Sequence, residues 1–248
     1  MENFINLNGK VFLVTGATSG IGLETCLQIS KYGGIVIGVG RNTEKLNALS
    51  NQLPSFVGIN YDLINIDGLD KLISKIDHQL DGIVHCAGIV QLLPIKFFNI
   101  EVLNKIRKVN YDSILVIISK LLKIKKINKD ASIIFISSIA SEMGMKGNSI
   151  YSSTKAALNS TTKVLASELA SQRIRVNSIA PGQVETKLTV EIESKVSLEA
   201  ILIDKKKYPL GYGIPEDVAN LSVFLLSSKS RWITGAVLNI DGGRSSTF

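Results

Sequence analysis

Short apolar segments alternate with longer segments of helical character along most of the chain. The short segments are rich in Val and Ile and show little alternation of apolar and polar residues, which is typical of strands buried on both faces. They predict strands at residues 11–15, 35–39, 56–60, 82–85, 132–137, 175–180 and 237–240. The longer segments predict helices at residues 21–32, 43–52, 102–125 and 149–171. Gly33 and Gly34 directly follow the first of these helices, as glycine often does at a helix C-terminus.

The alternation of strands and helices predicts the fold class. Parallel strands need a crossover, usually a helix, so regular alternation indicates a parallel sheet with helices on both faces. The 248 residues are within reach of one large α/β domain, and no internal repeat or Pro/Gly-rich linker divides them. We therefore predict an α/β fold in which residues 1–248 form a single doubly wound domain. Residues 183–213 are the least regular stretch, and we predict a mobile loop over the substrate there, because long loops in compact domains are usually functional.

Composition and charge narrow the class of protein without naming a function. Hydrophobic residues make up 45% of the chain and charged residues 20%, as in soluble globular proteins. The net charge is +7, and basic residues are densest at residues 120–129 and 205–207. We interpret these segments as a solvated helix end and a mobile loop, with attraction of an anionic substrate or an acidic carrier protein as the alternative. No nucleic-acid partner is expected, because neither a known reader motif nor basic residues interleaved with exposed aromatics occur.

Other features bear on the compartment. No apolar run approaches the roughly 18 residues that a membrane span needs. The segment MENFINLNGK has an acidic second residue and lacks the apolar stretch of a signal peptide. Cys26 and Cys86 are far apart and in apolar contexts, so neither a disulfide framework nor a zinc site is expected. These features predict a cytoplasmic protein without a membrane or metal partner.

The strongest chemical signal follows the first predicted strand, where residues 15–22 read TGATSGIG and a helix begins within the run. Glycines at positions 16, 20 and 22 let the chain turn tightly, let its backbone approach a pyrophosphate, and let helix and strand pack closely. The N-terminus of the helix offers free N–H groups and the positive end of its dipole to phosphates. The segment therefore predicts a phosphate-binding site.

The spacing of this loop and a series of later motifs resemble the short-chain dehydrogenase/reductase family. The run Thr-Gly-x-x-x-Gly-Ile-Gly differs from the Gly-x-Gly-x-x-Gly of many dinucleotide-binding folds and is similar to that of the family. Further matches occur in order along nearly the whole chain: Asp62-Leu63 after the third strand, Asn110 in KVNYDS, Ser138 in FISSIAS, Tyr151 and Lys155 in YSSTK, Pro181-Gly182 in IAPGQVETKL, residues 208–228, and Asp241-Gly242-Gly243. The resemblance implies a Rossmann-type fold and a nicotinamide-dependent interconversion of carbonyl and alcohol.

One segment departs from the family pattern. Where the family usually has Asn-Asn-Ala-Gly after the fourth strand, this chain has His85-Cys86-Ala87-Gly88. The two asparagines mainly brace the sheet in relatives, and the Ala-Gly portion, which lies against the cofactor, is kept. We interpret His85 as a buried neutral histidine, because no metal-ligand cluster accompanies it. We interpret Cys86 as a small buried apolar group rather than a reactive thiol.

Cofactor choice is usually decided at the end of the second strand, where a carboxylate accepts from the adenosine ribose and repels a 2′-phosphate. Residues 38–42 of this chain read GVGRN, with no acidic residue at that position. Arg41 has a planar guanidinium that suits a phosphate. We therefore predict NADP(H) in preference to NAD(H).

Tyr151 and Lys155 are spaced i, i+4 on a predicted helix, so both side chains project from one face. A free tyrosine, with a pKa near 10, is a poor proton-transfer group at neutral pH. We expect the Lys155 ammonium to lower the pKa of Tyr151 toward the operating pH.

The family resemblance implies roles for individual residues. In the reducing direction Tyr151 donates a proton to the carbonyl oxygen, and Ser138 hydrogen-bonds the same oxygen. Ser137 competes for that role, but Ser138 matches the family's spacing to Tyr151. Lys155 holds the nicotinamide ribose, and Asn110 anchors a water that links Lys155 to solvent. The implied cofactor contacts are Gly16, Thr18, Ser19, Gly20, Ile21, Gly22, Arg41, Asp62, Leu63, Ala87, Gly88, Asn110, Tyr151, Lys155, Pro181, Gly182, Val184 and Thr186.

The sequence leaves the substrate open beyond a small carbonyl compound or alcohol. A 3-oxoacyl thioester on an acyl carrier protein is one candidate, supported by the basic residues near Lys125 and Lys126. A dehydrogenase of a sugar or steroid-like alcohol is the second. A cofactor-binding regulatory protein without turnover is the third, although all four catalytic positions are filled. The resemblance also implies a homotetramer.

Overall fold

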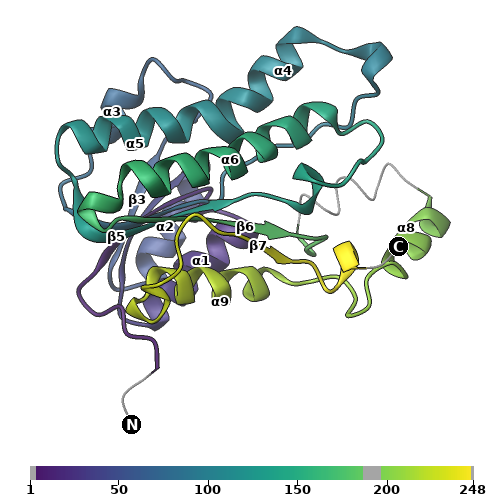
Figure 1. Cartoon of the computed structure of the whole chain (residues 1–248). Coiled ribbons are helices and arrows are strands. Elements are labelled where there is room, and N and C mark those ends of the chain that lie inside the picture. Colours follow the sequence, from purple (N-terminus) through teal and green to yellow (C-terminus); the bar gives the residue numbers. More distant parts are fainter. Residues whose placement is uncertain (1–3, 187–196, 247–248) are drawn as a thin grey trace.

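One parallel sheet forms the centre of the molecule. The computed structural model describes residues 4–186 and 197–246, and within them seven strands pair in parallel in the order β3-β2-β1-β4-β5-β6-β7 (Figure 1). The strands are β1 Val11–Thr15, β2 Ile35–Gly40, β3 Phe56–Asn60, β4 Leu80–His85, β5 Ile127–Ile136, β6 Arg175–Pro181 and β7 Val237–Ile240. The strand order reverses direction between β1 and β4, which is where doubly wound sheets bind their ligands.

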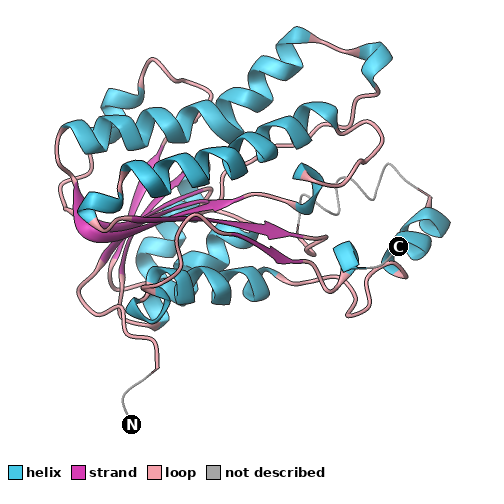
Figure 2. Ribbon diagram, in the orientation of Figure 1, coloured by secondary structure: helices cyan, strands magenta, loops and turns pink. Residues whose placement is uncertain are grey.

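Helices cover both faces of the sheet (Figure 2). The helices α3 Leu69–Ile73, α4 Ile100–Arg107, α5 Ser113–Lys123 and α6 Ser149–Glu168 lie on one face. The helices α1 Gly20–Lys31, α2 Thr43–Gln52 and α9 Pro215–Leu226 lie on the other. A further helix, α8 Leu198–Lys205, stands away from these layers, beyond the carboxyl ends of β6 and β7. Among the described helices, none has both the length and the apolar character that crossing a membrane requires.

Two hydrophobic cores, one on each side of the sheet, explain why the strands show no alternation of apolar and polar residues. Leu13 and Ile83 face the core beneath α5 and α6, whereas Phe12, Val84 and Ile134 face the core beneath α1 and α9. Successive strand residues point to opposite faces, so each of these strands is buried on both. The predicted doubly wound parallel sheet with helices on both faces is confirmed.

The predicted helical stretch at residues 102–125 is present, with helical residues running from 100 to 123, but it is not one uninterrupted α-helix. A π-helical turn, Lys108–Asp112, separates α4 from α5 and contains Asn110. Asn99 caps α4 by accepting hydrogen bonds from the backbone of Glu101 and Val102, which starts the helix earlier than predicted. Hydrophobic periodicity cannot reveal such a turn, because one extra residue shifts the pattern only slightly.

Two further predictions need correction. The basic stretch at residues 120–129 is only partly a helix end, since β5 begins at Ile127 and Lys126 donates a hydrogen bond to the Asp77 carbonyl. The stretch at residues 183–213 contains α8, and Lys205 ends that helix instead of lying in a loop. Residues 187–196 of this stretch lie outside the described residues, so its predicted mobility stays a prediction.

The turn from β1 into α1 depends on glycine. Gly16 and Gly20 have φ values of 72° and 52°, in the left-handed region that glycine adopts without strain. A Cβ atom on Gly22 would overlap the carbonyl group of Gly16, and would also press on the Cys86 side chain. The first turn of α1 therefore packs directly on the end of β1 and the loop after β4.

Replacing Gly22 with Ala should lower the free energy of unfolding by roughly 1–3 kcal/mol, because backbone atoms must move to accept the methyl group. Urea unfolding followed by circular dichroism measures the change. Gly144→Ala is the matched control, since a Cβ there meets nothing within 4 Å. Its effect should stay within about 0.5 kcal/mol. Equal losses in the two variants would show that the close approach at Gly22 does not matter.

Candidate active site

Two adjoining cavities open at the carboxyl ends of the strands. One, of about 390 Å³, lies between the end of β5, α6 and α8. The other, of about 440 Å³, lies along the glycine turn, the end of β2 and the loop after β3. Ile21, Cys86, Gly88 and Thr186 line both cavities, so the two meet at the switch point of the sheet. We refer to them as the substrate-side cavity and the cofactor-side cavity.

Most of the predicted cofactor residues lie around the cofactor-side cavity. Its walls include Gly16, Thr18, Ser19, Gly20, Ile21, Gly22, Arg41, Asp62, Leu63, Ala87, Gly88 and Thr186. Pro181, Gly182 and Val184 line the substrate-side cavity together with Tyr151 and Lys155. Asn110 lines neither cavity and is fully buried behind them. The first turn of α1 begins at Gly20, and Gly20, Ile21 and Gly22 all line the cofactor-side cavity, so the free N–H groups of this helix start lie at its wall.

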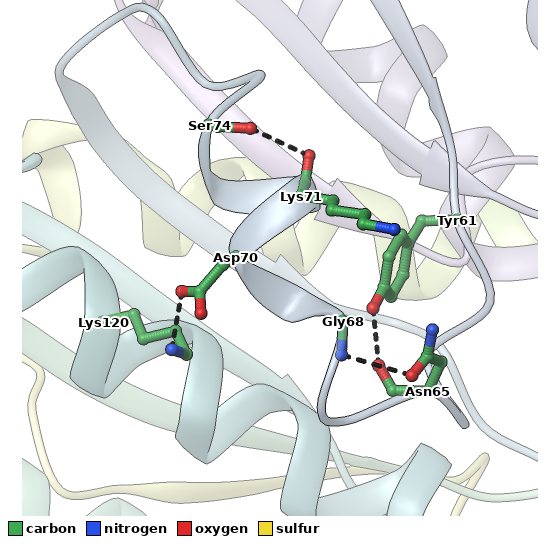
Figure 3. A network of polar contacts seen from close by, with 7 residues as sticks. All are labelled: Tyr61, Asn65, Gly68, Asp70, Lys71, Ser74 and Lys120. Carbon is green, nitrogen blue, oxygen red and sulfur yellow. Dashed lines mark hydrogen bonds and ion pairs between the residues drawn. The ribbon is translucent and has the colours of Figure 1, made fainter.

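A polar network holds the loop after β3, which carries Asp62 and Leu63 (Figure 3). Tyr61 donates its hydroxyl hydrogen to the Asn65 carbonyl, and the Gly68 N–H donates to the Asn65 side chain. Lys120 of α5 pairs with Asp70 of α3 at 2.6 Å and ties this region to the helical layer. These contacts fix the rim of the cofactor-side cavity.

Two cations stand where the second strand ends. The Arg41 guanidinium is 70% exposed and lies 3.8 Å from the Asp62 carboxylate. Lys45, in the first turn of α2, is half-buried, and its ammonium donates to the Thr18 carbonyl at 3.3 Å. Lys45 also lines the cofactor-side cavity. Sequence reasoning missed Lys45, although its position one helical turn after Arg41 was a usable signal.

Tyr151 and Lys155 lie together on α6 with the spacing predicted. The Lys155 ammonium is 5.5 Å from the centre of the Tyr151 ring and donates to the Ile136 carbonyl at 2.6 Å. The Lys155 side chain is only 3% exposed. Ser138 follows β5 and lines the substrate-side cavity, where it is a hydrogen-bond partner of Tyr151. Ser137 donates its hydroxyl hydrogen to the Lys155 carbonyl and so faces the helix backbone.

The expectation that Lys155 lowers the pKa of Tyr151 is wrong for this structure. Burial raises the pKa of Tyr151 to about 12, and only the hydrogen bond with Ser138 acts in the opposite direction. Burial also lowers the pKa of Lys155 to about 8. The physical reason is that low polarity penalises both charged forms, while the ammonium points at the Ile136 carbonyl.

A buried chain of hydrogen bonds lies behind Lys155. The Ala87 N–H donates to the Thr15 hydroxyl, which lies 2.8 Å from His85 Nδ1, and His85 Nε2 lies 3.2 Å from the Asn110 carbonyl oxygen. A carbonyl only accepts, so Nε2 carries the proton and Nδ1 accepts from Thr15. Burial and the charge of Lys155 lower the pKa of His85 to about 3, which confirms a buried neutral histidine.

The side chain of Asn110 joins three elements. Its oxygen accepts from the Ile89 N–H, and its nitrogen donates to the Ile89 carbonyl and to Thr154 Oγ1 on α6. Cys86 is only partly buried and lines both cavities, so the predicted burial is incomplete, but desolvation raises the pKa of its thiol to about 12 and keeps it neutral rather than reactive. The π-helical turn, the loop after β4 and α6 are therefore held in one arrangement around Lys155.

Comparison with known proteins identifies the family. The family described as Enoyl-(Acyl carrier protein) reductase matches residues 16–245. The 3-oxoacyl-[acyl-carrier-protein] reductase of Rickettsia bellii (strain RML369-C) is 37% identical over 242 residues, covering 96% of this chain and 98% of that protein.

Solved structures agree with this assignment. A short chain dehydrogenase family protein from Francisella tularensis is 29% identical, with a TM-score of 0.88 over 96% of this chain and 99% of that one. A Beutenbergia cavernae protein described as an NAD(P)-dependent gluconate 5-dehydrogenase, with bound NADP, is 27% identical, with a TM-score of 0.89 over 98% and 99% of the two chains. The chain therefore belongs to the short-chain dehydrogenase/reductase family and is an oxidoreductase that interconverts a carbonyl group and an alcohol.

Proposed function

We propose that this chain reduces a 3-oxoacyl thioester with NADPH as the hydride donor. The observation that carries the proposal is the placement of Tyr151 and Ser138 in a cavity that adjoins the glycine-lined groove. The groove fits a dinucleotide, because the glycine turn at Gly16 and Gly22 lets β1, α1 and the loop after β4 pack closely, and the first-turn N–H groups of α1 remain at the groove to receive a pyrophosphate. When bound, the cofactor supplies the hydride.

The residues of the substrate-side cavity supply the proton. Tyr151 donates its hydroxyl hydrogen to the carbonyl oxygen of the substrate, while Ser138 hydrogen-bonds the same oxygen as charge develops. A pKa of about 12 keeps Tyr151 protonated at neutral pH, which suits a donor in the reducing direction. We assign to Lys155 the binding of the nicotinamide ribose, because its ammonium lies beside Tyr151 at the wall of the cavity. Asn110 braces α6 and the loop after β4, and we assign to it the support of a water that links Lys155 to solvent.

The lining of the substrate-side cavity favours an acyl substrate over a sugar. Apolar side chains form much of its wall: Val90, Leu92, Ile139, Met145 and Ile201. An acyl chain would bury its methylene groups against these side chains, where a sugar hydroxyl group would find no partner. The similarity to a 3-oxoacyl-[acyl-carrier-protein] reductase supports the same substrate class.

The preference for NADPH rests on Arg41 and Lys45. Both line the groove beside Thr18 and Gly40, where a cofactor's adenosine ribose would lie. Asp62 partly compensates the charge of Arg41, whereas Lys45 contacts a neutral carbonyl. A 2′-phosphate would bring a compensating charge to both cations. Ser19 is placed in the same groove to add a hydrogen bond.

We also propose a cytoplasmic homotetramer. Ile100 on α4 and Val164 on α6 are exposed apolar side chains on the same helical layer, and such surfaces commonly pack against another subunit. The basic residues 205–207, at the end of the helix α8 that lines the substrate-side cavity, would favour approach of an acidic carrier protein, whereas residues 120–129 lie at the opposite end of the strands, where β5 begins.

Tyr151→Phe removes the proton donor and keeps the ring. Turnover should fall by roughly 10²–10⁴-fold, as expected for loss of a general acid. Cofactor affinity, measured by fluorescence titration, should stay unchanged because the phosphates are held elsewhere. Tyr32→Phe, at the far end of α1, is the matched control and should keep full turnover. Near-normal turnover in Tyr151→Phe would refute the assignment.

Lys155→Met should abolish turnover and yet change stability in a pH-dependent way. Burial lowers the pKa of Lys155 from 10.5 to about 8, so the unfolded chain binds more protons between these values and the wild type gains stability as the pH rises. Below pH 8 the buried Lys155 ammonium is charged in the folded wild type, and its full unfavourable desolvation free energy then lowers the stability. The free energy of unfolding of Lys155→Met relative to wild type should therefore fall by about 2 kcal/mol between pH 7 and pH 9.5.

Urea unfolding of the cofactor-free protein at several pH values measures this difference. The hydrogen bond to Ile136 that the variant loses adds a constant that does not depend on pH. A relative stability that stays flat from pH 7 to pH 9.5 would mean that Lys155 keeps an ordinary pKa in the folded protein.

Cofactor preference is tested by removing each cation. Arg41→Ala and Lys45→Ala should each lower kcat/KM for NADPH by about tenfold, the value of one charge-assisted contact, and leave NADH nearly unchanged. Lys31→Ala, at the other end of α1, is the control. A wild type that prefers NADH, or variants that leave the NADPH/NADH ratio unmoved, would contradict the assignment.

A reversal of preference needs two changes. A Cβ at Gly40 would lie 2.6 Å from Thr18 Cγ2, so Gly40→Asp alone strains the turn. Gly40→Asp with Thr18→Ala removes the clash and places a carboxylate beside the ribose. That double variant should favour NADH by repelling the 2′-phosphate as well as accepting from the ribose.

A further inference from the structure

Asparagine occupies the N-cap of three helices in the described residues, and one of the three behaves differently. Asn42 caps α2 by accepting from the Lys45 N–H at 2.8 Å. Asn99 caps α4 by accepting from the Glu101 and Val102 N–H groups at 2.7 and 3.2 Å. Asn148 precedes α6, and its side chain makes no capping hydrogen bond. The usual reason for asparagine at this position is therefore missing at Asn148.

The amide group of Asn148 is nevertheless buried. The residue is only 6% exposed, and its Oδ1 has no hydrogen-bond partner. Its Nδ2 reaches Met145 Sδ at 3.8 Å, and a thioether is a weak acceptor. A buried polar group without partners is unfavourable for the folded state, so an apolar residue would suit the fold better. Such groups call for a specific explanation, and a ligand that completes the hydrogen bonds is one.

The location of Asn148 supplies that explanation. Asn148 lines the substrate-side cavity together with Tyr151 and Ser138. It precedes Tyr151 by three residues at the start of α6, so the two side chains lie on one side of the helix, one turn apart. Apolar side chains such as Leu92 also line this cavity, as does the cation of Lys146. Asn148 is a polar residue that stands at the start of the same helix as Tyr151, so a substrate oxygen close to the reacting carbonyl could reach its amide.

We propose that Asn148 recognises a second carbonyl oxygen of the substrate, placed two carbons from the ketone that is reduced. The inference rests on the proposed reduction of a 3-oxoacyl compound, in which two carbonyl groups stand in this 1,3 relation. Tyr151 and Ser138 bind the ketone oxygen, and Asn148 donates an Nδ2 hydrogen to the other oxygen. The amide nitrogen of Asn148 carries two hydrogens and makes only the 3.8 Å contact with Met145 Sδ, so one hydrogen remains to donate to a ligand in the cavity.

The test compares two probes that differ by one carbonyl group, 2,4-pentanedione and 2-pentanone, with saturating NADPH. For wild type, kcat/KM should be higher for the diketone. Asn148→Ala should lower kcat/KM for the diketone by about tenfold, the value of one hydrogen bond, and leave 2-pentanone within about twofold. Asn148→Asp keeps the size of the side chain but has no side-chain N–H group. It should therefore lower kcat/KM for the diketone at least as much as Asn148→Ala does.

Asn99→Ala is the matched control, because that asparagine does cap its helix. It should lower Tm by about 2–4 °C and leave the ratio of the two probes unchanged. Asn148→Ala should change the ratio without lowering Tm. If Asn148→Ala lowers kcat/KM equally for both probes, so that the ratio of the two values does not change, Asn148 has a structural role and the inference is overturned. An Asn148→Asp variant that keeps the preference would show that the substrate donates to Asn148, which also overturns it.

A binding measurement separates this inference from the proposed function. Dissociation constants of both probes are measured by NMR titration of the protein with bound cofactor, without turnover. If wild type fails to reduce a 3-oxoacyl thioester, the proposed function fails. The inference then still stands if Asn148→Ala weakens binding of the diketone but not of 2-pentanone. It is overturned if binding of both probes weakens equally or if neither probe binds.

Discussion

The charge of Lys155 lies inside the protein, and much of the surrounding structure follows from that constraint. Its ammonium is 3% exposed and donates to the carbonyl at the end of β5. A positive charge in such a place disfavours any further charge nearby. The pKa of His85 falls to about 3 in part because of Lys155, so the histidine stays neutral and can join Thr15 to Asn110. The same burial keeps Tyr151 protonated, so a proton donor and a cation stand side by side without neutralising each other.

The sequence-based predictions succeeded where burial determines which residues occur along the chain. They failed where one contact with a distant residue determines the local structure or the pKa. The strands could be recognised because both faces are packed, which demands apolar residues at every position. The glycine turn could be recognised because the backbone there excludes a Cβ. The π-helical turn at Lys108–Asp112 left no such trace, since it depends on the distant partner Ile89. The direction of the Tyr151 pKa shift was also wrong, because spacing says nothing about which carbonyl holds the ammonium of Lys155.

Charge in the cofactor-side cavity shows the same difference between local pattern and spatial arrangement. Arg41 is prominent in the sequence because it stands next to a position that is usually acidic, yet it is exposed and faces Asp62. Lys45 is inconspicuous in the sequence, but the capping of α2 by Asn42 fixes its backbone and the turn toward Thr18 brings its ammonium to the groove. An exposed pair such as Arg41 with Asp62 is weak in water, so a phosphate can compete for the guanidinium. The proposed selectivity for NADPH therefore depends on both cations, and neither the exposed arginine nor the lysine would indicate it without the other.

One helix, α6, brings recognition and chemistry together. Its first turn carries Asn148 and Tyr151, and the next carries Lys155, whose ammonium is anchored to β5. A helix start fixed by a capping asparagine would direct the amide of Asn148 back to the backbone, where it could contact no substrate. In this structure Asn148 makes no capping hydrogen bond. The helix is stabilised by packing against the sheet instead, since Leu158 and Thr162 farther along α6 are fully buried. Because the stability of α6 comes from its middle, its N-terminal turn is left available for the proposed contact between Asn148 and a substrate bound at Tyr151.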